Sequence, residues 1–196
     1  VNDFDNCRYN SVAKFLEKKR LELIYNEIRA NMGNNLLFVD ADVVFAKKTN
    51  IKQEISEILS ENDLAFQFND SWYNFGVFAI SCNNKTEELF RHFLDNEIDK
   101  VFEDKNLHDQ HLINALLGIY PDNVGISYKV EKVFNDIKHT HLPIKYFGNH
   151  FKNYKFPQTM PQNVTLFHAT NTYNMPDKLQ VMTKFKKQYY DGVEKT

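Results

Sequence analysis

The stretch "NNLLFVDADVVFAK", residues 34–47, predicts a buried strand that ends in two carboxylates. Its apolar run leads directly into Asp40 and Asp42, which stand one residue apart. Burying a carboxylate is costly unless a positive charge or a hydrogen-bond donor meets it. A hard divalent cation prefers carboxylate oxygens, and it takes few of them from the protein because phosphate and water complete its shell. The stretch therefore predicts a metal site that carries a diphosphate.

The segments around this stretch predict alternating helices and strands. The expected helices cover residues 10–33, 50–62, 85–96 and 109–118, with a basic helix at the C-terminus. The expected strands cover residues 36–40, 63–68, 74–81, 126–134 and 164–168. This alternation predicts an α/β fold with a mainly parallel, Rossmann-like sheet flanked by helices, in a single domain over residues 1–196.

Arg20 has an unusual place in the first expected helix. The apolar residues of this helix are expected to form one buried arc, composed of Val12, Leu16, Leu23, Ile24 and Ile28. Arg20 lies four residues from both Leu16 and Ile24, so it is expected to project from this arc. Without further context the arginine is expected to extend its charge to solvent from the rim of the core.

Composition excludes several classes of protein. The 17 Phe, 10 Tyr and 1 Trp among 196 residues supply a core, and a net charge of −2 predicts no nucleic-acid partner. Cys7 and Cys82 are too few for a disulfide framework, so a reducing compartment, the cytoplasm, is expected. Both cysteines are expected to pack as small apolar residues. No apolar run approaches the ~20 residues that cross a bilayer.

Histidines extend the predicted metal site. His168 ends the apolar strand "VTLFH", residues 164–168, and ligands in α/β sheets lie at such strand ends. An imidazole there can be a third ligand beside the two aspartates. The alternative is that the aspartates bind turn backbone and that His168 is only hydrogen-bonded. We expect "HTH", residues 139–141, to lie in a loop, and His108 and His111 to flank Asp109 without binding the metal.

Four segments in order resemble the GT-A nucleotide-diphospho-sugar transferases. They are "RLELIYNEIRANMGNNLLFVDADVVF", "WYNFGVFAIS", "HDQHLINALL" and "VTLFHATN". The resemblance covers most of the chain and is greatest to small DXD enzymes of bacteria and of large DNA viruses. It implies transfer of a hexose from a nucleoside-diphosphate sugar, most often a UDP-sugar, to a hydroxyl of a glycan or glycoprotein. It also implies a bound Mn²⁺ or Mg²⁺.

The resemblance implies a role for residues around the diphosphate. Asp42 matches the main metal ligand, Asp40 the residue that contacts ribose and metal, and His168 the third ligand. Lys178 is the nearest counterpart of the family's phosphate-binding lysine, although here "HATNTYNMPDK" places it ten residues after His168 and lacks the usual glycine.

Other residues are implied at the donor sugar. Arg20 matches a basic residue that reaches the sugar or phosphates, and Asn74 and Gly76 match an Asn-x-Gly strand that lines the sugar pocket. Asp109 matches an acidic residue that approaches the anomeric carbon, with Gln110 beside it. The local alternatives are that Asp109 is a helix N-cap and that Gly76 only permits close packing.

The sequence leaves other functions open. Only 39 residues precede Asp40, so the family's first strand is expected to be truncated or missing. An apolar strand ending in Asp-x-Asp also opens the haloacid-dehalogenase phosphatases, in which Asp40 would be the nucleophile and Asp42 the general acid. A third reading is a sugar-binding module without turnover. Release of nucleoside diphosphate from a sugar donor separates the three.

Overall fold

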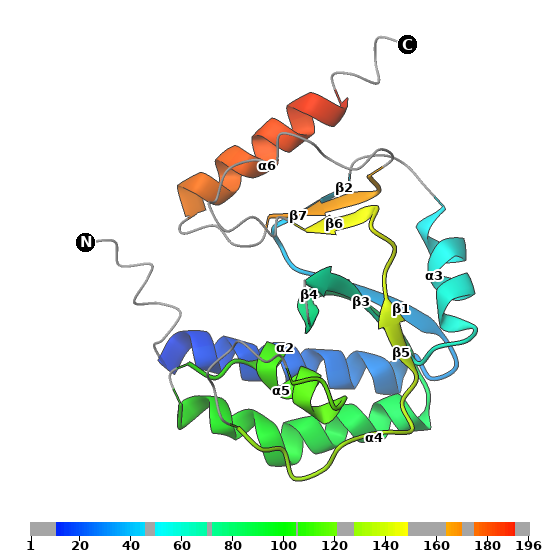
Figure 1. Cartoon of the computed structure of the whole chain (residues 1–196), viewed down its shortest axis with the longest axis vertical. Coiled ribbons are helices and arrows are strands. Elements are labelled where there is room, and N and C mark those ends of the chain that lie inside the picture. The colour runs from blue at the N-terminus through cyan, green and yellow to red at the C-terminus, as the bar shows by residue number, and fades with distance from the viewer. Residues whose placement is uncertain are drawn as a thin grey trace.

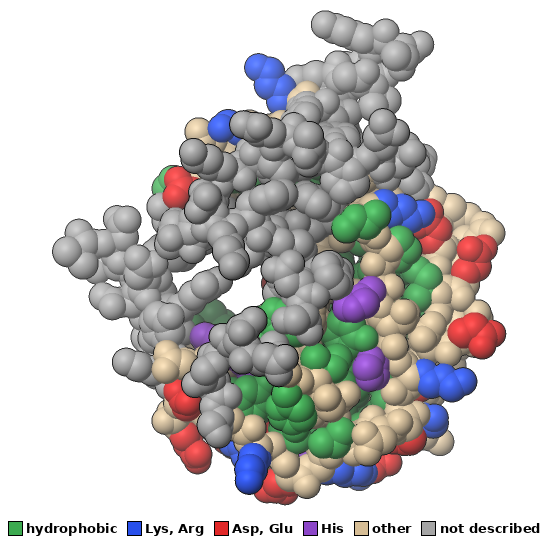
Figure 2. All heavy atoms as spheres, viewed as in Figure 1, with side chains coloured by type: hydrophobic (Ala, Val, Ile, Leu, Met, Phe, Trp, Pro, Cys, Tyr) green, Lys and Arg blue, Asp and Glu red, His purple; other side chains and the backbone are tan. Residues whose placement is uncertain are grey.

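The computed structural model describes residues 11–45, 50–69, 72–104, 106–120, 128–148, 164–169 and 175–190. In these ranges helices cover two small β-sheets (Figure 1). The expectations for the N-terminal strand and for Cys7 lie outside the described residues. On the face seen in Figure 2, acidic and basic side chains of the described residues are interspersed around the rim.

Local signals set the ends of the helices. The helices are α2 (Ser11–Ala30), α3 (Ile51–Leu59), α4 (Asn84–His92), α5 (Asp109–Leu116) and α6 (Met175–Tyr190), and α4 continues as the π-helical turn η1 (Phe93–Glu97) and the 3-10 turn η2 (Ile98–Phe102). After α2 the chain turns at Gly33, whose φ of 84° favours glycine. Asn50 caps α3, and the Asn83 side chain accepts from two backbone N–H groups of α4.

The strands form one four-stranded sheet and one three-stranded sheet. The first has the order β1 (Asn35–Val39), β4 (Trp72–Ser81), β3 (Leu64–Asn69), β5 (His139–His141), and the second has the order β2 (Val43–Phe45), β7 (Leu166–His168), β6 (Tyr146–Gly148). Pairs β3–β5 and β6–β7 are parallel, whereas β1–β4, β3–β4 and β2–β7 are antiparallel. The fold is α/β with mixed sheets, so the expectation of a mainly parallel sheet holds only in part.

A short connection explains much of this difference. Only residues 70 and 71 separate β3 from β4. A parallel pair needs a crossover of a dozen or more residues, so a connection this short makes the pair antiparallel. The sequence shows no helix between these strands, and this signal was available before the structure.

Helices cover both faces of the four-stranded sheet. One core cluster joins α2, α4 and α5 to one face, with Phe66 and Phe78 fully buried between them (Figure 1). A second cluster places Ile55 and Leu59 of α3 on the other face. A third joins α6 to β7, where the rings of Phe167 and Phe185 stack with centroids 4.6 Å apart.

The expected apolar arc of α2 is wrong in part. Ile24 and Ile28 are buried as expected, but Val12, Leu16 and Leu23 are each more than half exposed. The buried face instead runs through Lys14, Leu21, Ile24 and Ile28. Two apolar arcs exist on this helix, and its contacts with α4 and the sheet decide which one is buried. Arg20 lies between the two arcs, beside the strand end that carries Asp40.

Two predictions for the later part of the chain are also wrong. The described part of 126–134 contains no strand, because side chains meet its backbone: Glu97 accepts from Glu131 N at 2.8 Å, and Lys100 donates to Lys129 O at 3.2 Å. Conversely, "HTH" forms β5 and not a loop, since it pairs in parallel with β3.

Candidate active site

The Asp-x-Asp turn joins the two sheets. Asp40 follows β1, and its N–H donates to Gly76 O of β4 at 2.7 Å. Asp42 precedes β2, and its carbonyl accepts from Ala169 N at 3.1 Å, just beyond β7. Backbone hydrogen bonds on both sides therefore fix where the two carboxylates point. The partners of these hydrogen bonds, in β4 and just beyond β7, are distant from the turn in the sequence.

His168 lies against both aspartates. The β2–β7 pairing sets Val43 opposite His168, which brings the imidazole beside the turn. His168 Nε2 is 3.2 Å from Asp42 Oδ1 and 3.9 Å from Asp40 Oδ2. One ligand atom from each of the three residues lies within 4.8 Å of the others, so the cluster can hold a metal ion. Two carboxylates and an imidazole are ligands of a divalent metal.

Gln67, which no local signal marked, sets the tautomer of His168. Gln67 is buried, and its Nε2 donates to Tyr146 O at 2.9 Å. Its Oε1 therefore faces His168 Nδ1, at 2.8 Å, and can only accept. This arrangement favours a proton on Nδ1 and turns Nε2, the other ring nitrogen, toward the aspartates. Metal-binding histidines commonly have such a partner on the other ring nitrogen.

Lys178 contacts the opposite side of Asp42. Its Nζ lies 2.5 Å from Asp42 Oδ2, whereas Asp42 Oδ1 faces His168. Burial would raise the pKa of Asp42, but His168 and Lys178 outweigh burial and hold the pKa well below its ordinary value. Asp42 is therefore a carboxylate at neutral pH, and α6 contributes a cation to the site.

Gly76 leaves the space in which the cluster fits. The pairing of β3 with β4 shifts between Phe66 and Gln67, so β4 bulges at this point. Asn74 Oδ1 accepts from Gly76 N at 2.7 Å and supports the bulge. A Cβ on Gly76 would lie 2.5 Å from both Asp40 Oδ2 and His168 Cε1. Any side chain here would displace two of the three candidate ligands, which gives the glycine a reason beyond close packing.

Arg20 joins the metal cluster to α5. Its Nη1 donates to Asp40 Oδ1 at 3.1 Å, its Nη2 donates to Asp109 Oδ2, and its guanidinium lies over the Phe75 ring at 5.0 Å. Burial alone would lower the pKa of Arg20, but the two carboxylates raise it above its ordinary value. Arg20 is thus a fixed cation between two carboxylates, not a rim arginine that extends to solvent.

Asp109 is the first residue of α5 and not its N-cap. The cap is His108, whose N–H donates to His111 Nδ1 at 3.0 Å. Asp109 is almost fully buried, and its N–H donates to Glu17 Oε2 at 3.3 Å. Burial raises the pKa of Asp109, while Arg20 acts against this shift. The N-cap alternative for Asp109 is therefore wrong, and its carboxylate is held by Arg20.

Two amides hold α5 against β4. Gln110 Oε1 accepts from Phe75 N at 3.1 Å, at the bulge where the strand ladder is interrupted. Asn114, which sequence reasoning missed, accepts from Tyr73 N at 2.8 Å and donates to Tyr73 O at 2.9 Å. Gln110 thus has a structural contact in addition to its place beside Asp109.

The charged groups of the site border one cavity of about 360 Å³. The residues proposed from the sequence all line it: Arg20, Asp40, Asp42, Asn74, Gly76, Asp109, Gln110, His168 and Lys178. Their roles stay predictions. Glu17 and Trp72 line the cavity too and were not assigned before. Glu17 lies one helical turn before Arg20, so helical spacing was a usable signal for it.

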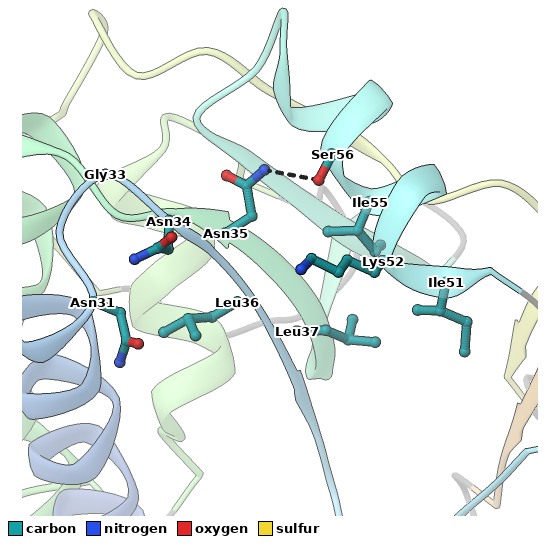
Figure 3. A pocket seen from close by; sticks show the side chains of 10 residues that line it. All are labelled: Asn31, Gly33, Asn34, Asn35, Leu36, Leu37, Ile51, Lys52, Ile55 and Ser56. Atoms are coloured by element: carbon teal, nitrogen blue, oxygen red, sulfur yellow. Dashed lines mark hydrogen bonds between the residues drawn. The ribbon is translucent and has the colours of Figure 1, made fainter.

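A larger hollow, of about 700 Å³, lies at the other end of β1. Figure 3 shows Leu36 and Leu37 of β1 together with Lys52 and Ile55 of α3 along its wall. Among the described residues that line this hollow there is no carboxylate or imidazole. These residues therefore offer no Asp, Glu or His ligand for a metal, and the smaller cavity is the candidate active site.

Comparison with known families identifies the class of protein. A family model, nucleotide-diphospho-sugar transferase, matches residues 25–182, which include both aspartates and His168. The chain belongs to this family. No curated protein matches the chain. The transferase shows, among its described residues, no helix with the length and apolar character that a bilayer crossing requires. Its substrates are a nucleotide-sugar donor and an acceptor.

Proposed function

We propose that the protein is a metal-dependent GT-A hexosyltransferase that moves a sugar from a UDP-sugar to a hydroxyl of a glycan or glycoprotein. Asp40, Asp42 and His168 would hold Mn²⁺ or Mg²⁺. The observation that carries this proposal is the convergence of these ligand atoms within 4.8 Å in a member of a nucleotide-sugar transferase family. The absence of a side chain at Gly76, which lets Asp40 and His168 approach each other, and the orientation of His168 Nε2 support a bound cation.

In the reaction, the bond between the anomeric carbon and the diphosphate oxygen breaks, and the electron pair leaves with the diphosphate. The acceptor oxygen forms the new bond, and its proton passes either to the departing diphosphate or to a carboxylate that acts as a base. A bound divalent cation supplies electrostatic stabilisation of the charge that builds on the diphosphate. Arg20 and Lys178, the two cations that line the cavity beside the aspartates, would act on the same charge.

Asp109 would act at the sugar. As the bond breaks, the anomeric carbon gains positive character, which a nearby carboxylate stabilises. Asp109 is the carboxylate on α5 that lines the cavity, and Arg20 fixes its position. Asn74 and Gln110 line the cavity beside it and would bind sugar hydroxyls. An inverting reaction would also require a base for the acceptor hydroxyl.

Calorimetry with UDP and with GDP, each with and without Mn²⁺ or Mg²⁺, tests the metal site. We expect metal-dependent binding that Asp42→Ala abolishes and that Asp99→Ala leaves intact, because Asp99 is an exposed partner of Lys18. Metal-independent binding, or unchanged metal dependence in Asp42→Ala, would contradict the proposal.

Turnover assays separate the proposed function from the alternatives. We expect release of nucleoside diphosphate from at least one nucleotide sugar and no hydrolysis of a generic phosphomonoester. The family match favours the transferase, and no finding supports the phosphatase. Nucleotide binding without any turnover across a donor and acceptor panel would instead indicate a sugar-binding module.

A further inference from the structure

The cavity extends along β4 beyond the metal cluster. Trp72, Asn74 and Gly76 alternate along this strand and all line the cavity. Side chains on one face of a strand recur every second residue, so Trp72, two residues beyond Asn74, lies furthest along the strand from Gly76. Gly76 therefore marks the metal end, and Trp72 lies away from it.

Trp72 presents an aromatic ring that the protein holds in place. It is the only Trp of the chain and the only Phe, Tyr or Trp among the described residues that line the cavity. The ring is half-buried and packs against His111, with centroids 5.0 Å apart at 45°. His111 is itself buried in the first turn of α5. The two hydrogen bonds between the Asn114 side chain and the Tyr73 backbone hold the residue next to Trp72 in place.

Polar groups line the same cavity as this ring. Glu17, His108 and Asp109 line it together with Trp72 and His111. A pyranose has an apolar C–H face and a rim of hydroxyl groups. The negative π-face of an aromatic ring attracts polarised C–H groups, and carboxylates and imidazoles bind hydroxyls. The chemistry at this end of the cavity therefore matches a neutral sugar ring.

We propose that Trp72 is the stacking platform for a pyranose ring of the acceptor. The acceptor hydroxyl accordingly belongs to a sugar and not to a Ser, Thr or Tyr side chain. This assignment rests on the proposed function, because the metal end of the cavity is taken as the donor site. Because His111 and α5 already hold the ring in place, less conformational entropy is lost when the sugar binds.

The single tryptophan makes the proposal directly measurable. Titration with methyl glycosides of glucose, galactose, mannose, xylose and N-acetylglucosamine, with and without UDP and Mn²⁺, is followed by Trp emission and by calorimetry. We expect at least one glycoside to change the emission saturably. Trp72→Ala should weaken its binding about 10-fold and Trp72→Phe less, because alanine removes the apolar contact with the sugar ring and phenylalanine keeps part of it. Phe102→Ala, at an exposed residue that does not line the cavity, is the control.

The outcomes separate this inference from the proposed function. If UDP and Mn²⁺ bind but no glycoside changes the emission or binds, the platform is wrong and the metal site stands. If a glycoside binds in a way that Trp72→Ala removes, the platform stands even where nucleotide binding fails. Glycoside binding that is equal in wild type and Trp72→Ala also overturns the proposal.

Discussion

The cavity contains two charged clusters that the protein stabilises by different means. At one end, Asp40, Asp42 and His168 lie at strand ends and are positioned by backbone hydrogen bonds and by Gln67. Next to it, Arg20 of α2 pairs with Asp109 of α5 and also reaches Asp40. The first cluster gathers two carboxylates and an imidazole in a geometry that can hold a metal ion, and its carboxylates also reach Arg20 and Lys178. In the second, the buried Asp109 has Arg20 as its charged partner. We therefore expect mutations in the first cluster to change metal-dependent binding most. Mutations in the second cluster should change stability and turnover.

Gly76→Ala should produce the largest effect, because it acts on the first cluster alone. The new Cβ would lie 2.5 Å from Asp40 Oδ2 and His168 Cε1, so both groups must move. Displacing two ligands should weaken metal-dependent UDP binding by roughly 10³-fold, since each lost positioning contact costs 10- to 100-fold. Calorimetry with Mn²⁺ measures this loss.

Gly33→Ala is the matched control for this change. It strains a backbone with φ of 84° but meets nothing within 4 Å. It should cost about 1 kcal/mol of stability and leave UDP binding unchanged. Normal metal-dependent binding by Gly76→Ala would show that the cluster is not the metal site.

Asp109→Asn tests the second cluster. The amide can still accept from Arg20, so the free energy of unfolding should fall by only about 1 kcal/mol, and UDP binding should persist. Turnover should fall by about 10²-fold if the carboxylate acts on the reacting sugar. Asp99→Asn, at an exposed residue, should change neither quantity. Near-normal turnover with melting like wild type would remove Asp109 from the reaction.

Gln67→Met tests the first cluster without changing a candidate metal ligand, because it removes the hydrogen-bond partner of His168. The change keeps the buried volume but leaves Tyr146 O and His168 Nδ1 without their hydrogen bonds. We expect metal affinity in the presence of UDP to fall 10- to 100-fold. The nitrogen chemical shifts of His168 should also show a change of tautomer. Gln53→Met, on the exposed side of α3, is the control. Unchanged affinity and tautomer would contradict the role of Gln67.

His111→Gln should have the smallest effect, visible only at acid pH. Burial, with the charges of His108 and Lys14, lowers the pKa of His111 to about 4. The unfolded chain therefore binds a proton below pH ~6.5 that the folded protein does not, and stability falls as the pH falls from there toward 4. The loss should reach about 2 kcal/mol at pH 4.5 in urea unfolding, because one pKa unit corresponds to ~1.4 kcal/mol.

Glutamine at this position can still cap His108 N but cannot titrate. The variant should therefore lose this part of the pH dependence while its stability at pH 7 stays close to that of wild type. An identical pH profile in both proteins would assign the acid sensitivity to other groups.

The local sequence was enough to predict groups whose position depends on neighbours in the chain. Asp40 and Asp42 follow an apolar strand, His168 ends another, and Gly33 ends α2, because strand period, turn chemistry and helix stops are short-range properties. The family resemblance then placed the remaining candidate residues, and all of them border one cavity.

Pairing between distant segments decided the parts of the structure that the local sequence did not predict. Whether a strand runs parallel, which arc of α2 is buried, and where β4 bulges all depend on which distant segments meet and in which register. For this reason Gln67 and Asn114 carried no local signal, since their partners lie 101 and 41 residues away in His168 and Tyr73. The sequence by itself determined the chemical groups of the site. The tertiary structure decided their geometry, because a carboxylate and an imidazole become one metal site only when backbone pairing brings them within a few ångströms.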